Sequence, residues 1–216
     1  MLTKKNIRFV LDTLEEMYPD ADCELTHDNE LELLIAVVLS AQATDALVNK
    51  VTPGLFLKYK TPEDYINVSL EELQNDIRRI GLYRNKAKNI RKLCADLIEK
   101  YDGEVPNDYD ALVNLAGVGR KTANVVVSVA FNQPAIAVDT HVERVSKRLG
   151  ICRYKDSVLE VEKTLMRKIP EEEWSPTHHR MIFFGRYHCQ AKTPNCPECP
   201  LLEICREGQK RMKKRS

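Results

Sequence analysis

Residues 115–123 read Leu-Ala-Gly-Val-Gly-Arg-Lys-Thr-Ala, and this stretch decides the fold. Its two glycines, one on each side of Val118, predict a tight turn between two helices, because glycine adopts backbone angles that other residues avoid. Val118 can point into the core and anchor the turn, while the leucine and alanine at the ends of the stretch allow close helix packing. The first backbone amides of the second helix can then bind an anion such as a DNA phosphate. The alternative is an ordinary helix–helix turn.

Lys121 stands in the first turn of that second helix. The positive end of the helix dipole disfavours a charged ammonium at this position. The dipole and partial burial would both lower the pKa of the lysine, and the neutral amine could then act as a nucleophile. A solvated surface lysine is the plainer interpretation. Asp139, in the segment 138–142 (Val-Asp-Thr-His-Val), also has two interpretations. It is a standard N-cap for the helix that it opens, or it is catalytic if it faces Lys121 across a cleft.

Helical patterns dominate the rest of the chain, and no run of residues alternates as a strand does. Caps and breakers predict helices over 3–18, from a cap at Asp28 to Leu39, from Thr61, from a capping box at Ser69 to Gly81, over 84–101, from Asn107, over 120–131, from Asp139 to Leu149, over 157–168 and over 174–188. Residues 134–138 are expected to be extended. We therefore predict an all-α chain with a domain seam near residue 132.

The composition is that of an ordinary soluble protein, with 43% hydrophobic residues, 30% charged residues and a net charge of +1 over 216 residues. It excludes a disordered chain, a collagen and a membrane bundle, and the 8 glycines disfavour a turn-rich all-β fold. The longest apolar stretch, Leu33 to Leu39, is too short to span a bilayer, and the N-terminus carries no secretory segment. We expect an intracellular protein in a reducing compartment.

Four of the 7 cysteines cluster near the C-terminus. They are Cys189, Cys196, Cys199 and Cys205. Four thiolates can hold zinc or an iron–sulfur cluster, and structural zinc sites usually use two Cys-x-x-Cys pairs separated by a longer loop. One such pair in a compact loop favours a [4Fe–4S] cluster and leaves zinc as the alternative. The isolated Cys23, Cys94 and Cys152 are expected to be small buried hydrophobic residues.

Two basic stretches have both a plain and a functional interpretation. Residues 84–92 contain five cations and no acids. The tail contains Lys210, Arg211, Lys213, Lys214 and Arg215. Each stretch is either a solvated face or a set of phosphate contacts, and the net charge of the whole chain does not decide between them.

The glycine hairpin with Lys121, the segment 138–142 and the cysteine loop occur together and in this order. This combination resembles the endonuclease III family of helix-hairpin-helix DNA glycosylases, and the likeness covers essentially the whole chain. The resemblance implies two helical domains with a DNA groove between them. One is a six-helix barrel, residues 22–132, that ends in the hairpin. The other, residues 1–21 plus 133–216, holds a [4Fe–4S] cluster on the four clustered cysteines.

The resemblance also implies an activity, that of a bifunctional DNA glycosylase and apurinic/apyrimidinic-site lyase of base excision repair. Such an enzyme removes oxidised or ring-saturated pyrimidines from duplex DNA through a Schiff base on Lys121, with help from Asp139, and cuts the strand by β-elimination. Gln42 would fill the gap left by an extruded base, and Leu82 would wedge into the opposite strand. The other DNA contacts implied by the resemblance are Gly117, Val118, Gly119, Arg120 and His141.

Ala116 is one departure from the family, which usually has proline at this position. Alanine leaves the entry to the hairpin looser, so we expect a small effect on DNA grip and none on the chemistry. The implied partner is double-stranded DNA with damaged pyrimidines or abasic sites. We expect a cytoplasmic monomer that joins the nucleoid when on DNA and has no membrane partner.

Two rival functions remain at this point. The first is a monofunctional glycosylase that removes adenine from mismatches, which shares the hairpin, the aspartate and the cysteine loop but typically lacks the lysine. The second is a DNA-binding or redox-sensing protein without catalysis. Lys121 and the length of 216 residues argue against the first, which typically carries a further C-terminal domain, and borohydride trapping on abasic duplex DNA would separate the second.

Overall fold

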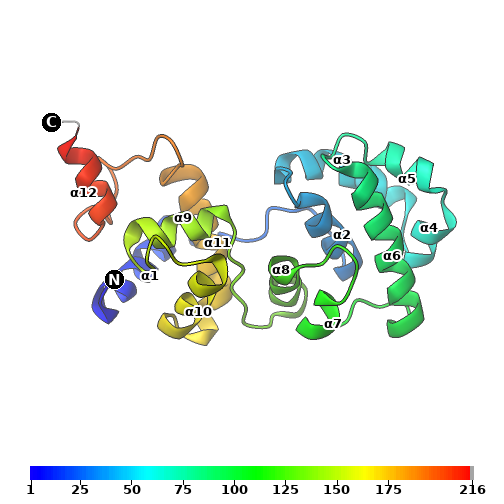
Figure 1. Cartoon of the computed structure of the whole chain (residues 1–216), viewed down its shortest axis with the longest axis horizontal. Coiled ribbons are helices and arrows are strands. Elements are labelled where there is room, and N and C mark those ends of the chain that lie inside the picture. The colour runs from blue at the N-terminus through cyan, green and yellow to red at the C-terminus, as the bar shows by residue number, and fades with distance from the viewer. Residues whose placement is uncertain (215–216) are drawn as a thin grey trace. The chain divides into compact units, whose positions relative to one another are not determined.

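The computed structural model describes residues 1–214, and these residues are helical without any strand (Figure 1). The α-helices are α1 (Lys4–Met17), α2 (Glu30–Ser40), α3 (Asp45–Lys58), α4 (Pro62–Asn67), α5 (Leu70–Asp76), α6 (Tyr83–Tyr101), α7 (Tyr109–Val113), α8 (Arg120–Phe131), α9 (Thr140–Leu149), α10 (Val158–Lys168), α11 (Trp174–Phe183) and α12 (Arg206–Lys213). A 3-10 helix, η1 (Glu171–Glu173), precedes α11, and a π-helix, η2 (Phe184–His188), follows it. The all-α prediction is confirmed.

The chain divides into two compact units. Unit 1 joins Met1–Asp22 to the chain from Pro134 onward, and unit 2 is Cys23–Gln133. This division lies one residue from the expected boundaries. Unit 2 contains the seven helices α2 to α8, whereas the resemblance implies a six-helix barrel, and α3 is the helix that no sequence pattern predicts. Pro53 lies inside α3 and is followed by Gly54, so the local sequence opposes a helix that tertiary packing nevertheless forms.

Unit 2 is built around α2, whose residues 33–39 are all at most 4% exposed. The helices α3, α6 and α8 pack against α2, and α4 packs along α6. An amphipathic stripe would bury one side only, so the continuous apolar run explains why α2 is covered on every side. Unit 1 has a separate core, in which α1 and α9 pack against α11 and α10 packs against α9. Each unit therefore has its own hydrophobic core.

The predicted cap of α2 is wrong by one residue. Asn29, rather than Asp28, caps this helix by accepting a hydrogen bond from the Glu32 amide at 2.9 Å. The Glu32 carboxylate in turn accepts from the Asp28 amide at 2.8 Å, so Asp28 takes part through its backbone. Two adjacent capping residues compete here, and the side chain of Glu32 decides between them.

The predicted capping box at Ser69 forms only in part. Ser69 Oγ accepts from the Glu72 amide at 3.1 Å, but the Glu72 carboxylate pairs with Lys58 Nζ at 2.8 Å. A tertiary partner has therefore taken the carboxylate that the local pattern required. By contrast, the box at Thr61 is complete, because Asp64 returns a carboxylate oxygen to the Thr61 amide at 2.9 Å.

Two helix boundaries also differ from the prediction. The helix expected from Asn107 is capped by Asp108, which accepts from the Ala111 amide at 2.7 Å, while the Asn107 side chain bonds with Gln133. The helix expected over 174–188 is an α-helix to Phe183 and a π-helix afterwards. The basic stretch near the C-terminus, for which the sequence predicted no helix, forms the helix α12. Arg215, one of its five cations, lies outside the described residues. Among the described residues, no helix is both long and apolar enough to cross a bilayer.

Candidate functional site

The glycine hairpin between α7 and α8 takes the predicted form. Gly117 has a φ of +79°, a left-handed conformation that L side chains rarely adopt. A Cβ atom at this position would lie 3.0 Å from Asn89 Cβ, so both the backbone angle and the space require glycine. Val118 is 6% exposed and its amide donates to Leu115 O at 3.1 Å, as expected of an apolar anchor.

The start of α8 carries the features of an anion site. Gly119 occupies the N-cap position in an extended conformation, and no side chain caps the helix. Arg120 lies 5.7 Å from the centroid of the Tyr109 ring, in a cation–π contact. Backbone N–H groups at such a helix start point along the positive end of the dipole, which suits a phosphate.

Lys121, in the same turn, is exposed, whereas the α8 residues 123–128 are buried. Of the two interpretations of Lys121, the structure therefore matches the solvated surface lysine, because this side chain lies outside the core that α8 covers. Its amine is open to solvent and to a ligand. The hairpin consequently offers a nucleophile beside a candidate phosphate site.

Gln42 and Leu82, the expected plug and wedge, come from two loops that lie against each other. A Cβ atom on Gly81 would lie 4.0 Å from Gln42 O, although some forty residues separate the two loops. Both side chains are exposed, Leu82 to 57%. Both residues have left-handed backbones, with φ of 56° for Gln42 and 59° for Leu82. An exposed leucine and glutamine on two adjoining strained turns form a compact projection from unit 2.

Asp139 and His141 lie at the start of α9 in unit 1. Asp139 caps the helix, since its Oδ1 accepts from the amides of His141 at 2.8 Å and Val142 at 2.7 Å. Both bonds end on Oδ1, so the cap does not use the second carboxylate oxygen. The expected N-cap is therefore present, and a further role for Oδ2 is compatible with it. Asp139 and Lys121 belong to different units.

Gly185, which the sequence analysis did not single out, decides how closely η2 approaches this helix start. A Cβ atom on Gly185 would lie 2.9 Å from His141 Cβ and 3.2 Å from the Arg144 guanidinium. Its carbonyl accepts a hydrogen bond from Arg144 at 2.7 Å. A π-helix beside a functional residue is a recurrent signal, but it is visible only once the backbone is known.

The cysteine loop is fixed to α9 by two arginines. Arg148 donates to Cys189 Sγ at 3.4 Å and to the carbonyls of Gln190 at 2.7 Å and Ala191 at 2.6 Å. Arg144 donates to Cys189 O at 3.2 Å. A guanidinium presents several donors in a rigid fork, which explains why arginine occurs at both positions. The entry to the cysteine loop is thereby held against the helix that Asp139 opens.

The four clustered thiols are close enough to affect one another. Burial raises the pKa of Cys199 to about 11, and Cys205, Cys189 and Cys196 add to that rise through their charges. Burial is also the main cause of the raised pKa of Cys205, whose sulfur accepts a hydrogen bond from the Gly208 amide at 3.3 Å. All 7 cysteines lie within the described residues, and none of them forms a disulfide.

The cysteine loop offers the donors that an iron–sulfur cluster needs, four soft sulfur atoms with N–H donors directed at two of them. In residues 1–214 no three His, Cys, Asp or Glu side chains stand already arranged as metal ligands. The donor set therefore fits a four-thiolate group. Cys94 and Cys152 are buried as predicted, and Cys23 is only half-buried.

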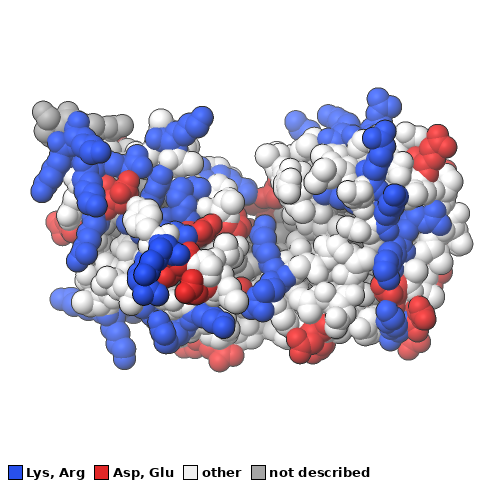
Figure 2. All heavy atoms as spheres, viewed as in Figure 1, with Lys and Arg blue, Asp and Glu red and all other residues white. Residues whose placement is uncertain are grey.

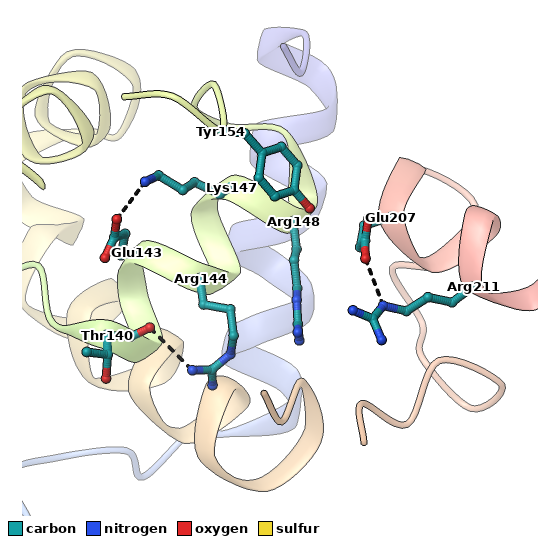
Figure 3. A pocket seen from close by; sticks show the side chains of 8 residues that line it. All are labelled: Thr140, Glu143, Arg144, Lys147, Arg148, Tyr154, Glu207 and Arg211. Carbon is teal, nitrogen blue, oxygen red and sulfur yellow. Dashed lines mark hydrogen bonds and ion pairs between the residues drawn. The ribbon is translucent and has the colours of Figure 1, made fainter. Parts of the chain in front are cut away.

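A groove of about 350 Å³ lies between α9 and α12 in unit 1. It is lined by Thr140, Glu143, Arg144, Lys147, Arg148, Tyr154, Glu207 and Arg211 (Figure 3). Two ion pairs span neighbouring turns inside it, between Lys147 and Glu143 and between Arg211 and Glu207. The groove is thus mostly cationic, but its cations already have protein partners.

Some of the five cations in the basic stretch 84–92 are buried or bonded within unit 2, and the others are exposed on its surface. Lys86 is buried, Arg91 donates to Ile66 O at 3.0 Å, and Lys92 pairs with Asp96. Lys and Arg side chains form a column over α6 and also gather over α12 (Figure 2). The phosphate-contact interpretation therefore applies to fewer cations than the sequence count suggests.

Comparisons with known proteins agree with these features. The model of the HhH-GPD superfamily of base excision DNA repair proteins matches residues 35–171. Endonuclease III of Bacillus subtilis (strain 168) is 72% identical over 214 residues, which are 99% of this chain and 98% of that protein. A non-covalent endonuclease III–DNA complex is similar with a TM-score of 0.97 and 74% identity, over 99% of this chain and 100% of that one. A trapped endonuclease III–DNA covalent intermediate, an estranged-adenine complex, is similar with a TM-score of 0.96 and 75% identity, over 98% of this chain and 100% of that one.

Proposed function

Because this chain belongs to the endonuclease III family of the HhH-GPD superfamily, and is thus a DNA glycosylase and apurinic/apyrimidinic-site lyase of base excision repair, we propose that Lys121 and Asp139 carry its reaction. Its substrates are oxidised or ring-saturated pyrimidines and abasic sites in duplex DNA. The observation that carries the proposal is the exposed Lys121 amine in the first turn of α8, directly after an uncapped glycine turn.

The reaction begins with extrusion of the damaged nucleotide, because a base inside a duplex hides its glycosidic carbon. Extrusion costs a few kcal/mol, and less for a ring-saturated base that stacks poorly. Gln42 fills the space that the base leaves, and Leu82 separates the opposite strand. The amides at the start of α8 and the segment Gly117-Val118-Gly119 hold a phosphate without reading its sequence.

The chemical steps follow from the neutral amine of Lys121. Its nitrogen attacks C1′ and displaces the base, which leaves with the bonding electron pair and takes up a proton. Opening of the sugar ring then gives a Schiff base between Lys121 and C1′, with the proton moving to O4′. The Schiff base acidifies the C2′ hydrogen, whose loss expels the 3′ phosphate and cuts the strand. Hydrolysis of the Schiff base releases the lysine.

Asp139 assists by accepting the proton from the lysine amine or by stabilising the positive charge that develops on the sugar. Its Oδ1 is committed to the α9 cap, which orients the carboxylate, and the reaction uses Oδ2. Asp139 and Lys121 must meet at the same deoxyribose for this role. His141 contributes a phosphate contact next to Asp139 on unit 1, and Arg120 contributes one next to Lys121 on unit 2.

Cys189, Cys196, Cys199 and Cys205 hold a [4Fe–4S] cluster in this proposal. When bound, the cluster supplies four metal–sulfur bonds that close the loop into one fixed shape. The residues of this chain then keep that shape: Arg148 binds the loop entry and the Gly208 amide donates to Cys205 Sγ. A zinc ion on the same thiolates is distinguished by colour, since an iron–sulfur protein absorbs visible light and a zinc protein does not.

Borohydride reduction with abasic duplex DNA tests the function. Wild type is expected to form a covalent adduct, and Lys121→Ala none. Lys100→Ala is the matched control, because Lys100 is an exposed lysine of unit 2 near the end of α6. Base release is measured on duplex DNA that carries a ring-saturated pyrimidine, and Asp139→Asn is expected to slow it by about 10²- to 10⁴-fold. Base release without an adduct would support a monofunctional glycosylase. If neither base release nor an adduct is observed, DNA binding without catalysis is the remaining function.

The assembly and location of the enzyme belong to the same proposal. It acts as a monomer in the cytoplasm and is nucleoid-associated on DNA. Size-exclusion chromatography with light scattering should give one chain per particle, near 24.8 kDa. A stable dimer would contradict the monomer.

A further inference from the structure

Lys86 is a charged residue in a buried position, where charged side chains are rare. It is only 5% exposed, in the first half of α6. Its Nζ donates to Leu39 O at 2.9 Å and to Ala41 O at 2.6 Å. These carbonyls lie at the C-terminus of α2, where unpaired acceptors and the negative end of the dipole attract a cation. Burial lowers the pKa of Lys86, so its charge carries a solvation penalty that the two hydrogen bonds offset.

The two carbonyls lead directly into the Gln42 turn. Ala41 is the residue before Gln42, whose φ is 56°. The adjoining turn is bound to the same helix, because Leu82 O accepts from the amides of Asn85 at 3.0 Å and Lys86 at 3.1 Å. Lys86 therefore stands one helical turn beyond Leu82 and contacts the residue before Gln42. One side chain connects the two loops.

Both turns need such support. A non-glycine residue in the left-handed region costs about 1–2 kcal/mol and persists only when its surroundings hold it there. Gln42 and Leu82 are both in that region, and Gly81 lies against Gln42 O. Two strained, exposed side chains on neighbouring turns are of little use to the stability of unit 2. They are useful as a rigid projection.

We propose that Lys86 is a positioning residue for base extrusion, which holds the Gln42 and Leu82 turns together in the shape that enters the duplex. This inference rests on the proposed function. Lys86 touches neither the reacting sugar nor Lys121 in this role. It acts through the two loops, so its contribution is confined to substrates that need a base extruded and a partner strand held apart.

Duplex and single-stranded DNA separate this role from a purely structural one. An abasic site in single-stranded DNA has no opposite strand to wedge and no stacked gap to fill, yet it offers the same C1′ to Lys121. Loss of Lys86 should therefore slow Schiff-base formation on duplex DNA and leave the single-stranded rate unchanged. A general loss of stability would lower both rates equally.

The experiment measures borohydride-trapping rates of the full-length holoenzyme on abasic duplex and on the same strand alone. Lys86→Met removes the ammonium and keeps the length of the side chain. We expect a loss of about ten- to a hundredfold on the duplex and no change on the single strand. The control is Lys100→Met, which removes the same charge from the other end of α6, about 20 Å away along the helix. It should behave as wild type.

A double-mutant cycle tests the route of the effect. In a Gln42→Ala/Leu82→Ala background the two side chains that Lys86 positions are gone, so Lys86→Met should cause no further loss on the duplex. Equal losses on both substrates, an unchanged duplex rate, or a full additional loss in that background would each overturn the proposal. If Lys86→Met does not fold, Lys86→Arg decides, because its planar head keeps the charge but cannot reproduce the two bonds. It should lose rate on the duplex alone.

The proposed function fails differently. If wild type forms no adduct on either substrate, both the activity assigned to Lys121 and the inference about Lys86 are overturned. If wild type reacts and Lys86→Met reacts equally well on the duplex, only the inference is overturned.

Discussion

The hairpin of unit 2 and the cysteine loop of unit 1 are held by different means. The hairpin depends on packing and backbone geometry, with Val118 buried between helices and Gly117 in a left-handed turn. The cysteine loop lies between η2 and α12 without an α-helix, and its entry is tied to α9 by hydrogen bonds from Arg144 and Arg148. The hairpin is specified by its own sequence, whereas the loop needs arginines from elsewhere and four sulfur ligands.

Because of this difference, the two regions should respond differently to loss of the cluster. An apolar anchor is insensitive to cofactor loading, so the hairpin and Lys121 should survive loss of the cluster. The cysteine loop contains thiols whose pKa values are raised by burial. Bonding to a metal cluster would offset the cost of ionising these neighbouring thiols. The proposed catalytic amine and the proposed cluster can therefore be separated experimentally.

The largest effect is expected from loss of a cluster ligand. Cys199→Ser should abolish the visible absorption of the cluster and weaken binding to abasic duplex DNA by about tenfold or more, because the loop loses its closure. Absorption spectra and fluorescence anisotropy check the two effects. Cys94→Ser, which changes a buried cysteine of unit 2, should keep the absorption. Unchanged DNA affinity after cluster loss would show that the loop does not present DNA contacts.

Arg148→Met should have the next largest effect. It removes charge-assisted hydrogen bonds to the loop entry, at Cys189, Gln190 and Ala191, and should lower the free energy of unfolding by about 3 kcal/mol. Urea unfolding measures the change. Arg8→Met is the comparison, since Arg8 forms only exposed ion pairs and should contribute less than about 1 kcal/mol. Equal effects of the two variants would mean that Arg148 does not hold the loop.

The hairpin offers a matched glycine pair with a smaller effect. Gly117→Ala should lower the free energy of unfolding by about 1–2 kcal/mol, because φ is +79° and Asn89 leaves no space. Gly119→Ala should lower it by less, about 0.5–1 kcal/mol, because Gly119 is extended with no atom within 4 Å of its added Cβ, and only the weaker N-cap preference of alanine counts. Denaturant titration compares the two variants. A larger loss at Gly119 would contradict the backbone argument.

The smallest expected effect is a dependence of the stability of unit 1 on pH. Burial lowers the pKa of His179, opposed weakly by Asp22 at 4.0 Å. The unfolded chain therefore binds a proton at His179 at a higher pH than the folded protein does. Stability should fall as pH drops through about 6.5 and level off below the folded pKa. His179→Gln should flatten this slope in urea unfolding at pH 5 to 8, and an identical slope in the variant would assign it to other groups.

Local signals were sufficient for much of the fold. Thr61 and Asp139 cap their helices as predicted, because each cap depends on residues within one turn. The hairpin was also predictable, since its glycine spacing and apolar anchor are adjacent in sequence. The prediction of α3 failed because Pro53 and Gly54 oppose a helix locally and only packing against α2 supports it.

The supports of the candidate site could not be predicted. Lys86 is one of five cations in a basic stretch, and its burial depends on the end of α2, more than forty residues earlier. Gly185 is an ordinary glycine in sequence, and its need for close contact with His141 follows from the π-helix. Such residues are defined by partners distant in the chain, so the sequence carries no local mark of them.

The central claim is that one particular amine, on Lys121, bonds to deoxyribose. Borohydride-trapped adduct on abasic duplex DNA can be digested and its modified peptide sequenced by mass spectrometry. We expect the sugar remnant on Lys121, within the peptide that spans the glycine hairpin. A remnant on another lysine or on the N-terminal amine would contradict it.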